Sequence, residues 1–225
     1  MSKRKDSSGY LYHWAKANIN YGGINEWYES AYTTLVNILS SFELRSGASQ
    51  GLSNGHSCIC FTESPISFIT GDNSKYQPFG LEFSKKDIYT LGGAQVFYCS
   101  RADYELLPQE LKWRWMIHEP LFRDSHRPYG IDFTWEREVR VNSQKVTLLG
   151  ESPITGASSV RNVDLAFNSI VVPNSHYKNR LLTDMEKRHF ADAKISARDE
   201  REYEWLLEFY EGLLEQYELQ IITLD

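Results

Sequence analysis

The sequence predicts a mixed α+β protein that forms one domain over residues 1–225. Three observations lead to this prediction: many short apolar segments typical of strands, a few longer segments with helical periodicity, and no internal repeat or low-complexity linker. The chain is 41% hydrophobic and 14% aromatic, so it can bury a sizeable core without disulfides. We therefore expect a mixed or antiparallel sheet flanked by helices.

The predicted strands are short, and Gly, Pro, Ser or Asn bound most of them. They cover residues 9–15, 57–61, 80–83, 94–99, 134–142, 145–149, 169–172 and 219–224. Residues 1–8 are polar and are expected to be flexible. Residues 191–225 are expected to form a C-terminal helix and strand.

Three segments have the periodicity of amphipathic helices. From Ile24 to Phe42, apolar residues recur every three or four positions, and the helix is expected to end near Ser46-Gly47. A second helix is predicted from about 175 to 190. In a third, apolar residues from Trp205 to Tyr217 follow a single stripe, which indicates packing against the core rather than a partner.

Composition and motif searches exclude several classes of protein. The net charge of −6 argues against binding nucleic acid over the whole surface. No apolar stretch is as long as a membrane span, and no signal region follows Met1, so we expect a cytoplasmic protein without membrane contact. The six His and three Cys form no zinc-type spacing, and we predict no metal. Dinucleotide-binding glycine, phosphate-loop and Gly-x-Ser-x-Gly patterns are absent.

One local segment combines cations with aromatic rings. It runs from Lys112 to Arg127 and contains Arg114, Arg123 and His126. Such residues contact phosphates and stack on bases, which favours a local nucleic-acid groove. The equally weighted alternative is a loop or helix with tryptophans in the core and solvated arginines.

The strongest chemical signal is Glu136-Arg137-Glu138 in the predicted strand 134–142. The two-residue period of a strand places Thr134, Glu136, Glu138 and Arg140 on one face. A carboxylate beside an arginine stays ionised inside a cleft, where it stabilises an oxocarbenium-like ribose cation. The alternative is an ordinary half-buried strand with alternating charges.

His13 lies near the end of the first predicted strand. It fits two interpretations, a residue that donates a hydrogen bond to a ribose hydroxyl or a core histidine satisfied by the backbone.

Taken together, four segments resemble the ADP-ribosyltransferase-like fold. They are the first strand with His13, Leu44-Arg45-Ser46-Gly47 after the first helix, Cys60-Phe61-Thr62-Glu63-Ser64-Pro65, and Trp135-Glu136-Arg137-Glu138-Val139-Arg140. Residues 76–98 fit the same pattern. More narrowly, the sequence is similar to bacterial AbiGi-type abortive-infection proteins, and more distantly to the DarT nucleic-acid ADP-ribosyltransferases. The resemblance covers roughly residues 9–173.

The resemblance implies a split sheet and a reaction that uses NAD as substrate. It assigns the nicotinamide-side ribose to His13 and the catalytic role to Glu138, with Glu136 as the first glutamate of a Glu-x-Glu pair. The NAD site would be lined by His13, Ser46, Gly47, Phe61, Thr62 and Arg140. The loop 120–133 would recognise the acceptor, with Arg114, Arg123, His126 and Arg127 as substrate-binding residues.

The implied role is an effector of phage defence that modifies DNA or RNA and is neutralised by an antitoxin protein. Two alternatives remain open: an enzyme that modifies protein or hydrolyses NAD, and a catalytically silent binding module on the same fold. The sequence departs from DarT in lacking an arginine at 61–64, where Glu63 would face a pyrophosphate. The stretch 18–30 is also longer than expected, as for a lid or a partner surface.

Overall fold

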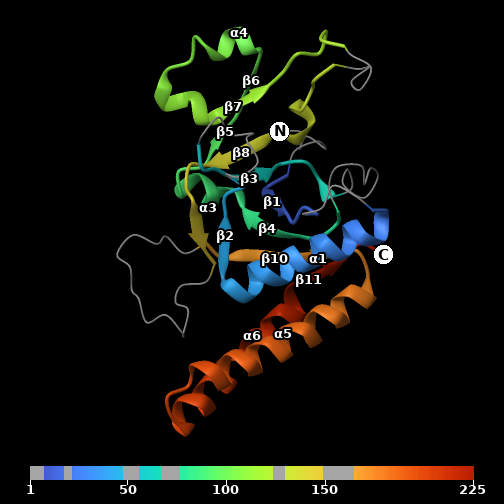
Figure 1. Ribbon diagram of the computed structural model, residues 1–225, viewed down its shortest axis with the longest axis vertical. Coiled ribbons are helices and arrows are strands. Elements are labelled where there is room, and N and C mark those ends of the chain that lie inside the picture. Colours follow the sequence, from blue (N-terminus) through green and yellow to red (C-terminus); the bar gives the residue numbers. More distant parts are fainter. Residues whose placement is uncertain (1–7, 18–21, 48–55, 67–76, 124–129, 149–164) are drawn as a thin grey trace. The chain divides into compact units, whose positions relative to one another are not determined.

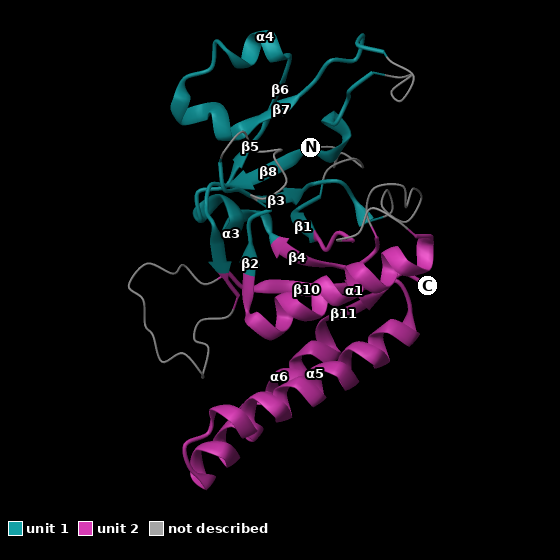
Figure 2. Cartoon of the chain, in the orientation of Figure 1, with its two compact units in different colours: residues 1–13, 44–66, 84–146 teal, residues 14–43, 67–83, 147–225 magenta. Residues whose placement is uncertain are grey.

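The computed structural model describes residues 8–17, 22–47, 56–66, 77–123, 130–148 and 165–225 (Figure 1). Its helices and strands alternate along the chain in a mixed α+β fold. The chain forms two compact units, each assembled from segments that are far apart in the sequence (Figure 2). Unit 1 comprises residues 1–13, 44–66 and 84–146, and unit 2 comprises residues 14–43, 67–83 and 147–225.

The sheet of unit 1 contains the segments with the strongest chemical signals. Strands β1 (Tyr10–Trp14), β3 (Ile59–Thr62), β8 (Glu138–Val141) and β5 (Ala94–Gln95) follow one another in antiparallel pairs. Tyr12 is opposite Thr62, and Thr62 is opposite Glu138. Because directly opposed residues point to the same face of a sheet, these three side chains share one face.

Smaller elements complete unit 1. Strand β2 (Glu43–Arg45) pairs with β9 (Lys145–Thr147), and β6 (Phe97–Cys99) pairs in parallel with β7 (Trp115–Ile117). The helical elements are α3 (Lys85–Thr90), α4 (Arg101–Tyr104) and the 3-10 helices η2 (Gln109–Arg114) and η3 (Thr134–Glu136).

The connection between β7 and β8 is closed at its base by backbone hydrogen bonds. Glu119 and Ile131 exchange two of them, at 2.8 and 3.0 Å. Next to this bridge, Gly130 adopts a φ of +80°, and a Cβ atom there would lie 2.2 Å from the Pro120 carbonyl oxygen. Glycine is therefore required at Gly130 for both its conformation and its lack of a side chain.

Unit 2 contains three paired strands and the three long helices. Strand β10 (Phe167–Val172) pairs antiparallel with β4 (Gly80–Ser84) and parallel with β11 (Ile221–Thr223). Helices α5 (Ser175–Ser196) and α6 (Glu200–Gln220) form a hairpin that packs on β10, and α1 (Ile24–Ser41) packs on α5. The side chains of Asn174 and Asp199 cap α5 and α6 by accepting backbone N–H groups of their first turns.

Most predicted elements are confirmed, but several of their boundaries differ. The segment 94–99 is split into β5 and β6, which pair with different strands. The first helix ends at Ser41, because Phe42 turns the chain in the left-handed region (φ 52°) and β2 follows at once. Residues 24–30, expected to belong to the insertion 18–30, are the first turns of α1, while residues 18–21 lie outside the described part.

The predicted strand 134–142 begins only at Glu138. Asp132 accepts hydrogen bonds from the backbone N–H and the hydroxyl of Thr134, at 2.8 and 2.6 Å, and this local turn starts η3. Arg137 then adopts a φ of 45° and a ψ of 51° before the extended backbone begins. The sequence pattern predicted that Thr134 and Glu136 share a strand face with Glu138. This is wrong, because both residues lie in η3 and not in the strand.

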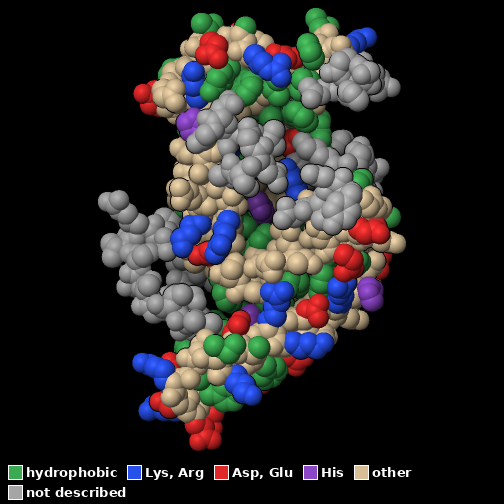
Figure 3. All heavy atoms as spheres, in the orientation of Figure 1, with side chains coloured by type: hydrophobic (Ala, Val, Ile, Leu, Met, Phe, Trp, Pro, Cys, Tyr) green, Lys and Arg blue, Asp and Glu red, His purple; other side chains and the backbone are tan. Residues whose placement is uncertain are grey.

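Surface chemistry is mixed on the face shown in Figure 3, where Lys and Arg side chains alternate with Asp and Glu along the α5–α6 hairpin. None of the described helices has both the length and the apolar composition needed to cross a bilayer. Within the described ranges, no three His, Cys, Asp or Glu side chains come together as metal ligands.

Candidate functional site

The candidate site lies in unit 1, where η3 passes into β8. Hydroxyl groups at the end of β3 hold the backbone of this turn in place. The Thr62 hydroxyl donates to the Glu136 carbonyl oxygen, and the Ser64 hydroxyl donates to the Trp135 carbonyl oxygen. The segment Thr62-Glu63-Ser64 thus fixes where the chain turns into β8.

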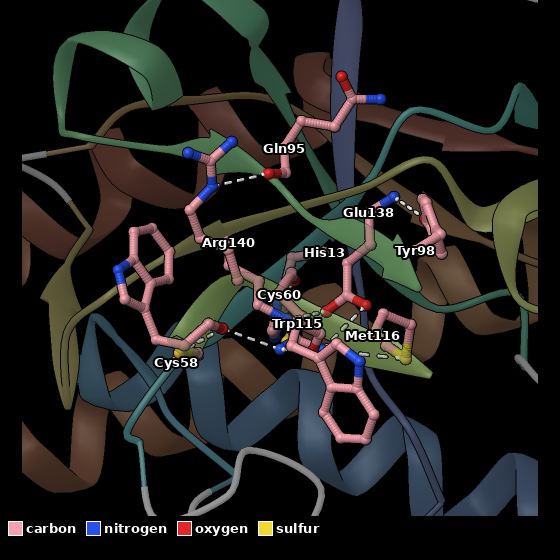
Figure 4. Close-up of polar contacts among 11 residues, drawn as sticks. His13, Cys58, Cys60, Gln95, Tyr98, Trp115, Met116, Glu138 and Arg140 are labelled. Carbon is pink, nitrogen blue, oxygen red and sulfur yellow. Dashed lines mark hydrogen bonds and ion pairs between the residues drawn. The ribbon is translucent and has the colours of Figure 1, made fainter. Parts of the chain in front are cut away.

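Glu138 and Arg140 form a buried ion pair on one face of β8. Arg140 Nε lies 2.8 Å from Glu138 Oε1, and Arg140 donates a second hydrogen bond from Nη2 to Oε2 at 3.3 Å (Figure 4). The exposed fractions are 4% for Glu138 and 3% for Arg140. The sequence pattern predicted this pairing correctly, since residues two apart in a strand share a face.

The Arg140 guanidinium is also anchored on its other side. Its Nη1 donates to the carbonyl oxygens of Trp113 and Trp115, at 2.9 and 2.8 Å. Burial alone would lower the pKa of Arg140, but the charge and hydrogen bonds of Glu138 more than offset this, so its pKa is raised. Arg140 is therefore a fixed, permanent cation beside the carboxylate of Glu138.

Tyr98 is a further member of the site, on β6. Its hydroxyl oxygen accepts the backbone N–H of Glu138 at 2.7 Å (Figure 4). Burial, and then the nearby charges of Glu138 and Glu136, raise the pKa of the Tyr98 phenol. The charges of both glutamates thus raise the pKa of the same phenol, although the two residues do not share a strand face.

His13 lies on β1 with its ring against Phe61, at 5.8 Å between ring centroids. Its Nδ1 is 2.9 Å from the Cys60 carbonyl oxygen. A carbonyl oxygen only accepts, so Nδ1 carries the hydrogen and donates to the Cys60 backbone. A bond from the ring to the backbone is what the interpretation of His13 as a core histidine expects.

The strand register separates His13 from Glu138. Tyr12 shares its face with Thr62 and Glu138, so the next residue, His13, points to the opposite face together with Phe61. The structure brings Glu136, Glu138, Arg140 and Thr62 together, and leaves His13 on the other side of the same sheet.

The other residues expected to line the NAD site are spread over unit 1. Ser46 and Gly47 follow β2, and the Ser46 N–H donates to the Gln144 carbonyl oxygen at 2.8 Å. Phe61 is fully buried, as a core residue would be. Glu63 forms an ion pair with Lys85 at 2.8 Å, so its negative charge has a nearby cation.

The expected substrate-binding residues differ in their contacts and exposure. Arg114 donates from Nε to the Gln95 carbonyl oxygen at 2.9 Å and lies over the Phe97 ring, 4.2 Å from its centroid. Arg123 is exposed next to Phe122, an aromatic side chain that is 51% exposed. His126 and Arg127 lie outside the described residues.

Sequence reasoning missed Tyr98 and Ser64 as parts of this site, and it expected Thr62 to line the NAD site rather than to hold the turn before β8. The sequence did indicate that these hydroxyls have partners, because buried polar groups at the end of a strand form hydrogen bonds. Tyr98 gave no such signal, since its contact with Glu138 depends on how β6 leaves the sheet after β5.

Comparisons with models of protein families, with curated proteins and with solved structures gave no match. Fold and site define a mixed α+β protein with a buried Glu–Arg pair at the start of β8 and a second glutamate in the turn before it.

Proposed function

We propose that this protein is an NAD-dependent ADP-ribosyltransferase that modifies nucleic acid. The observation that carries the proposal is the buried pair of Glu138 and Arg140 at the start of β8, with Glu136 in the preceding turn. The sequence resemblance to ADP-ribosyltransferase-like proteins supports the assignment of these two glutamates.

The proposed reaction breaks the bond between C1′ of the ribose and the nicotinamide nitrogen, and nicotinamide leaves with the bonding electrons. The ribose then carries an oxocarbenium-like charge, which the Glu138 carboxylate stabilises. A nucleophilic nitrogen or oxygen of the acceptor forms the new bond to C1′, and its proton passes to Glu136. Arg140 holds the Glu138 carboxylate in place throughout, because its guanidinium donates to both carboxylate oxygens.

Nucleic acid is the proposed acceptor because of the side chains at the base of the 120–133 loop. Phe122 offers an exposed ring for base stacking, and the adjacent Arg123 offers a cation for a phosphate. Arg114 contributes less than the sequence implied, since it is already bonded to Gln95 and stacked on Phe97.

The biological setting rests on the resemblance alone. We propose that the protein is a cytoplasmic effector of phage defence, and that a second protein neutralises it. NAD is the substrate in this proposal, with Ser46, Gly47 and Thr62 as lining residues, and no metal takes part. The resemblance also assigns the ribose to His13, but His13 lies on the opposite face of the sheet from Glu138 and is not proposed to hold the reacting ribose. Transfer to protein or hydrolysis of NAD uses the same carboxylates and differs only in the acceptor.

One observation favours a second candidate, a silent binding module. Arg140 occupies both carboxylate oxygens of Glu138, and only 4% of Glu138 is exposed. A purely structural ion pair, which would hold β8 and the β6–β7 pair together, has the same geometry.

The test is incubation of the purified protein with NAD labelled in its adenylate part, alone, with single-stranded or duplex nucleic acid, or with cell lysate. Label on nucleic acid that is lost in Glu138→Gln but kept in Glu110→Gln, at an exposed position of η2, supports the proposal. Label on protein, or nicotinamide release without transfer, selects the corresponding alternative. Absence of turnover in every mixture selects the binding module.

A further inference from the structure

We propose that Tyr98 is a positioning residue of this site, whose hydroxyl holds the first residue of β8 in the place that the chemistry requires. The inference rests on the proposed function for its catalytic consequence, but its structural part is testable without any activity.

The ladder between β5 and β8 ends at Glu138. The Val96 N–H donates to the Glu138 carbonyl oxygen at 3.0 Å, so both backbone groups of Glu138 face β5. After Val96 the chain leaves β8 and enters β6, which pairs with β7 instead. The Glu138 N–H donates to the Tyr98 hydroxyl at 2.7 Å, so a side chain takes the position of a ladder partner.

A backbone N–H at the buried end of a strand needs an acceptor, because leaving it unpaired costs the full desolvation penalty. Glu138 is buried, and the residue before it, Arg137, adopts a left-handed conformation. The Tyr98 hydroxyl therefore stabilises the point where the turn becomes a strand, and this point sets the direction of the Glu138 side chain.

The same hydroxyl has one hydrogen of its own to donate. The hydroxyl oxygen accepts from the Glu138 N–H, and the charges of Glu138, Glu136 and Arg140 all act on the same phenol. The Tyr98 hydroxyl thus lies at the turn that carries both glutamates. Thr62 and Ser64 hold the other side of the turn through the Glu136 and Trp135 carbonyls.

Tyr98→Phe removes the hydroxyl and keeps the ring, and Tyr104→Phe is the matched control. Tyr104 lies in the same unit, and its ring packs on Trp115 at 4.7 Å between centroids. We expect Tyr98→Phe to lower kcat about tenfold or more while KM for NAD changes less than about twofold, because the NAD-lining residues are untouched. Tyr104→Phe should change neither.

A second readout is independent of activity. Hydrogen exchange of the Glu138 amide, resolved by NMR, should speed up at least tenfold in Tyr98→Phe relative to wild type, while the Arg140 and Phe61 amides keep their protection. If wild type shows no turnover with NAD, the proposed function fails, yet this result still decides the role of Tyr98. Unchanged protection of the Glu138 amide, or a general loss across β3 and β8, would overturn the inference.

Discussion

Glu138 and Arg140 meet in a buried two-point ion pair at the start of β8, with 2.8 Å between Arg140 Nε and Glu138 Oε1. The two residues stand two apart on one strand, and the same guanidinium also bonds two carbonyl oxygens at the junction of η2 and β7. This pair joins the central sheet of unit 1 to the β6–β7 segment. Its consequences for stability and for chemistry are separable by experiment.

Removing the cation alone should be costly. Arg140→Met leaves Glu138 as a buried charge without a partner, and we expect the free energy of unfolding to fall by about 3–5 kcal/mol in denaturant titration. Arg123→Met, at an exposed position, should stay within about 0.5 kcal/mol of wild type. The double variant Glu138→Leu/Arg140→Met should recover much of the loss. If Arg140→Met alone is as stable as wild type, the ion pair is open to water and not buried.

Much of the fold was predictable from the sequence, because apolar periodicity and strand composition are local. The α1, α5 and α6 helices and the β1, β3, β8 and β10 strands all come from such patterns. The pairing of Glu138 with Arg140 followed from the two-residue period alone.

The remainder depends on side-chain contacts that a local pattern does not contain. The turn at 134–136 is set by Asp132 bonding to Thr134, which overrides the strand-like composition around it. The separation of His13 from Glu138 depends on which residues of β1 and β3 are opposed, and only the register decides this. Tyr98 enters the site because β6 changes partners.

The base of the 120–133 loop offers a test of backbone conformation. Gly130 and Gly92 both have positive φ, 80° and 92°, but only Gly130 has no room for a Cβ atom. Gly92→Ala should cost roughly 1–2 kcal/mol from conformation alone, whereas Gly130→Ala should cost clearly more because it displaces the Pro120 carbonyl. Both costs are measurable by denaturant unfolding. Equal costs would show that the loop base adjusts freely.

The hairpin of unit 2 should be sensitive to acid. The ring of His189 is buried and stacked between Tyr210 and Phe42, with centroids at 4.2 and 6.2 Å, and neither ring nitrogen has a hydrogen-bond partner among the described residues. Burial lowers the pKa of His189 from 6.5 to about 4. The unfolded chain therefore binds more protons between these values, and stability should fall as the pH drops from about 6.5 to 4.

The size of this loss follows from the pKa difference and is on the order of 3 kcal/mol. His189→Phe keeps a flat ring between Tyr210 and Phe42 and has no proton to bind. Thermal unfolding at pH 7 and at pH 4.5 should show a smaller difference for this variant than for wild type. Equal pH dependence in the two proteins would place the acid sensitivity elsewhere.

Nucleic-acid binding should depend on the exposed ring of Phe122. Phe122→Ala removes an exposed stacking surface and should weaken binding of a single-stranded oligonucleotide by about 1–3 kcal/mol, measured by fluorescence anisotropy at fixed salt. Leu106→Ala, which removes another exposed apolar side chain of unit 1, is the control and should have no effect. If both variants bind as wild type does, the acceptor contacts lie outside this loop base.

The central claim is that Glu138 stabilises the ribose cation formed from NAD. The most direct test is nicotinamide release from NAD by wild type and by Glu138→Gln, at a temperature where circular dichroism shows both to be folded, since Arg140 loses its counter-charge in the variant. We predict release by wild type and at least a hundredfold loss in the variant, which corresponds to about 3 kcal/mol in the barrier. Equal release by the two folded proteins would contradict the catalytic role of Glu138.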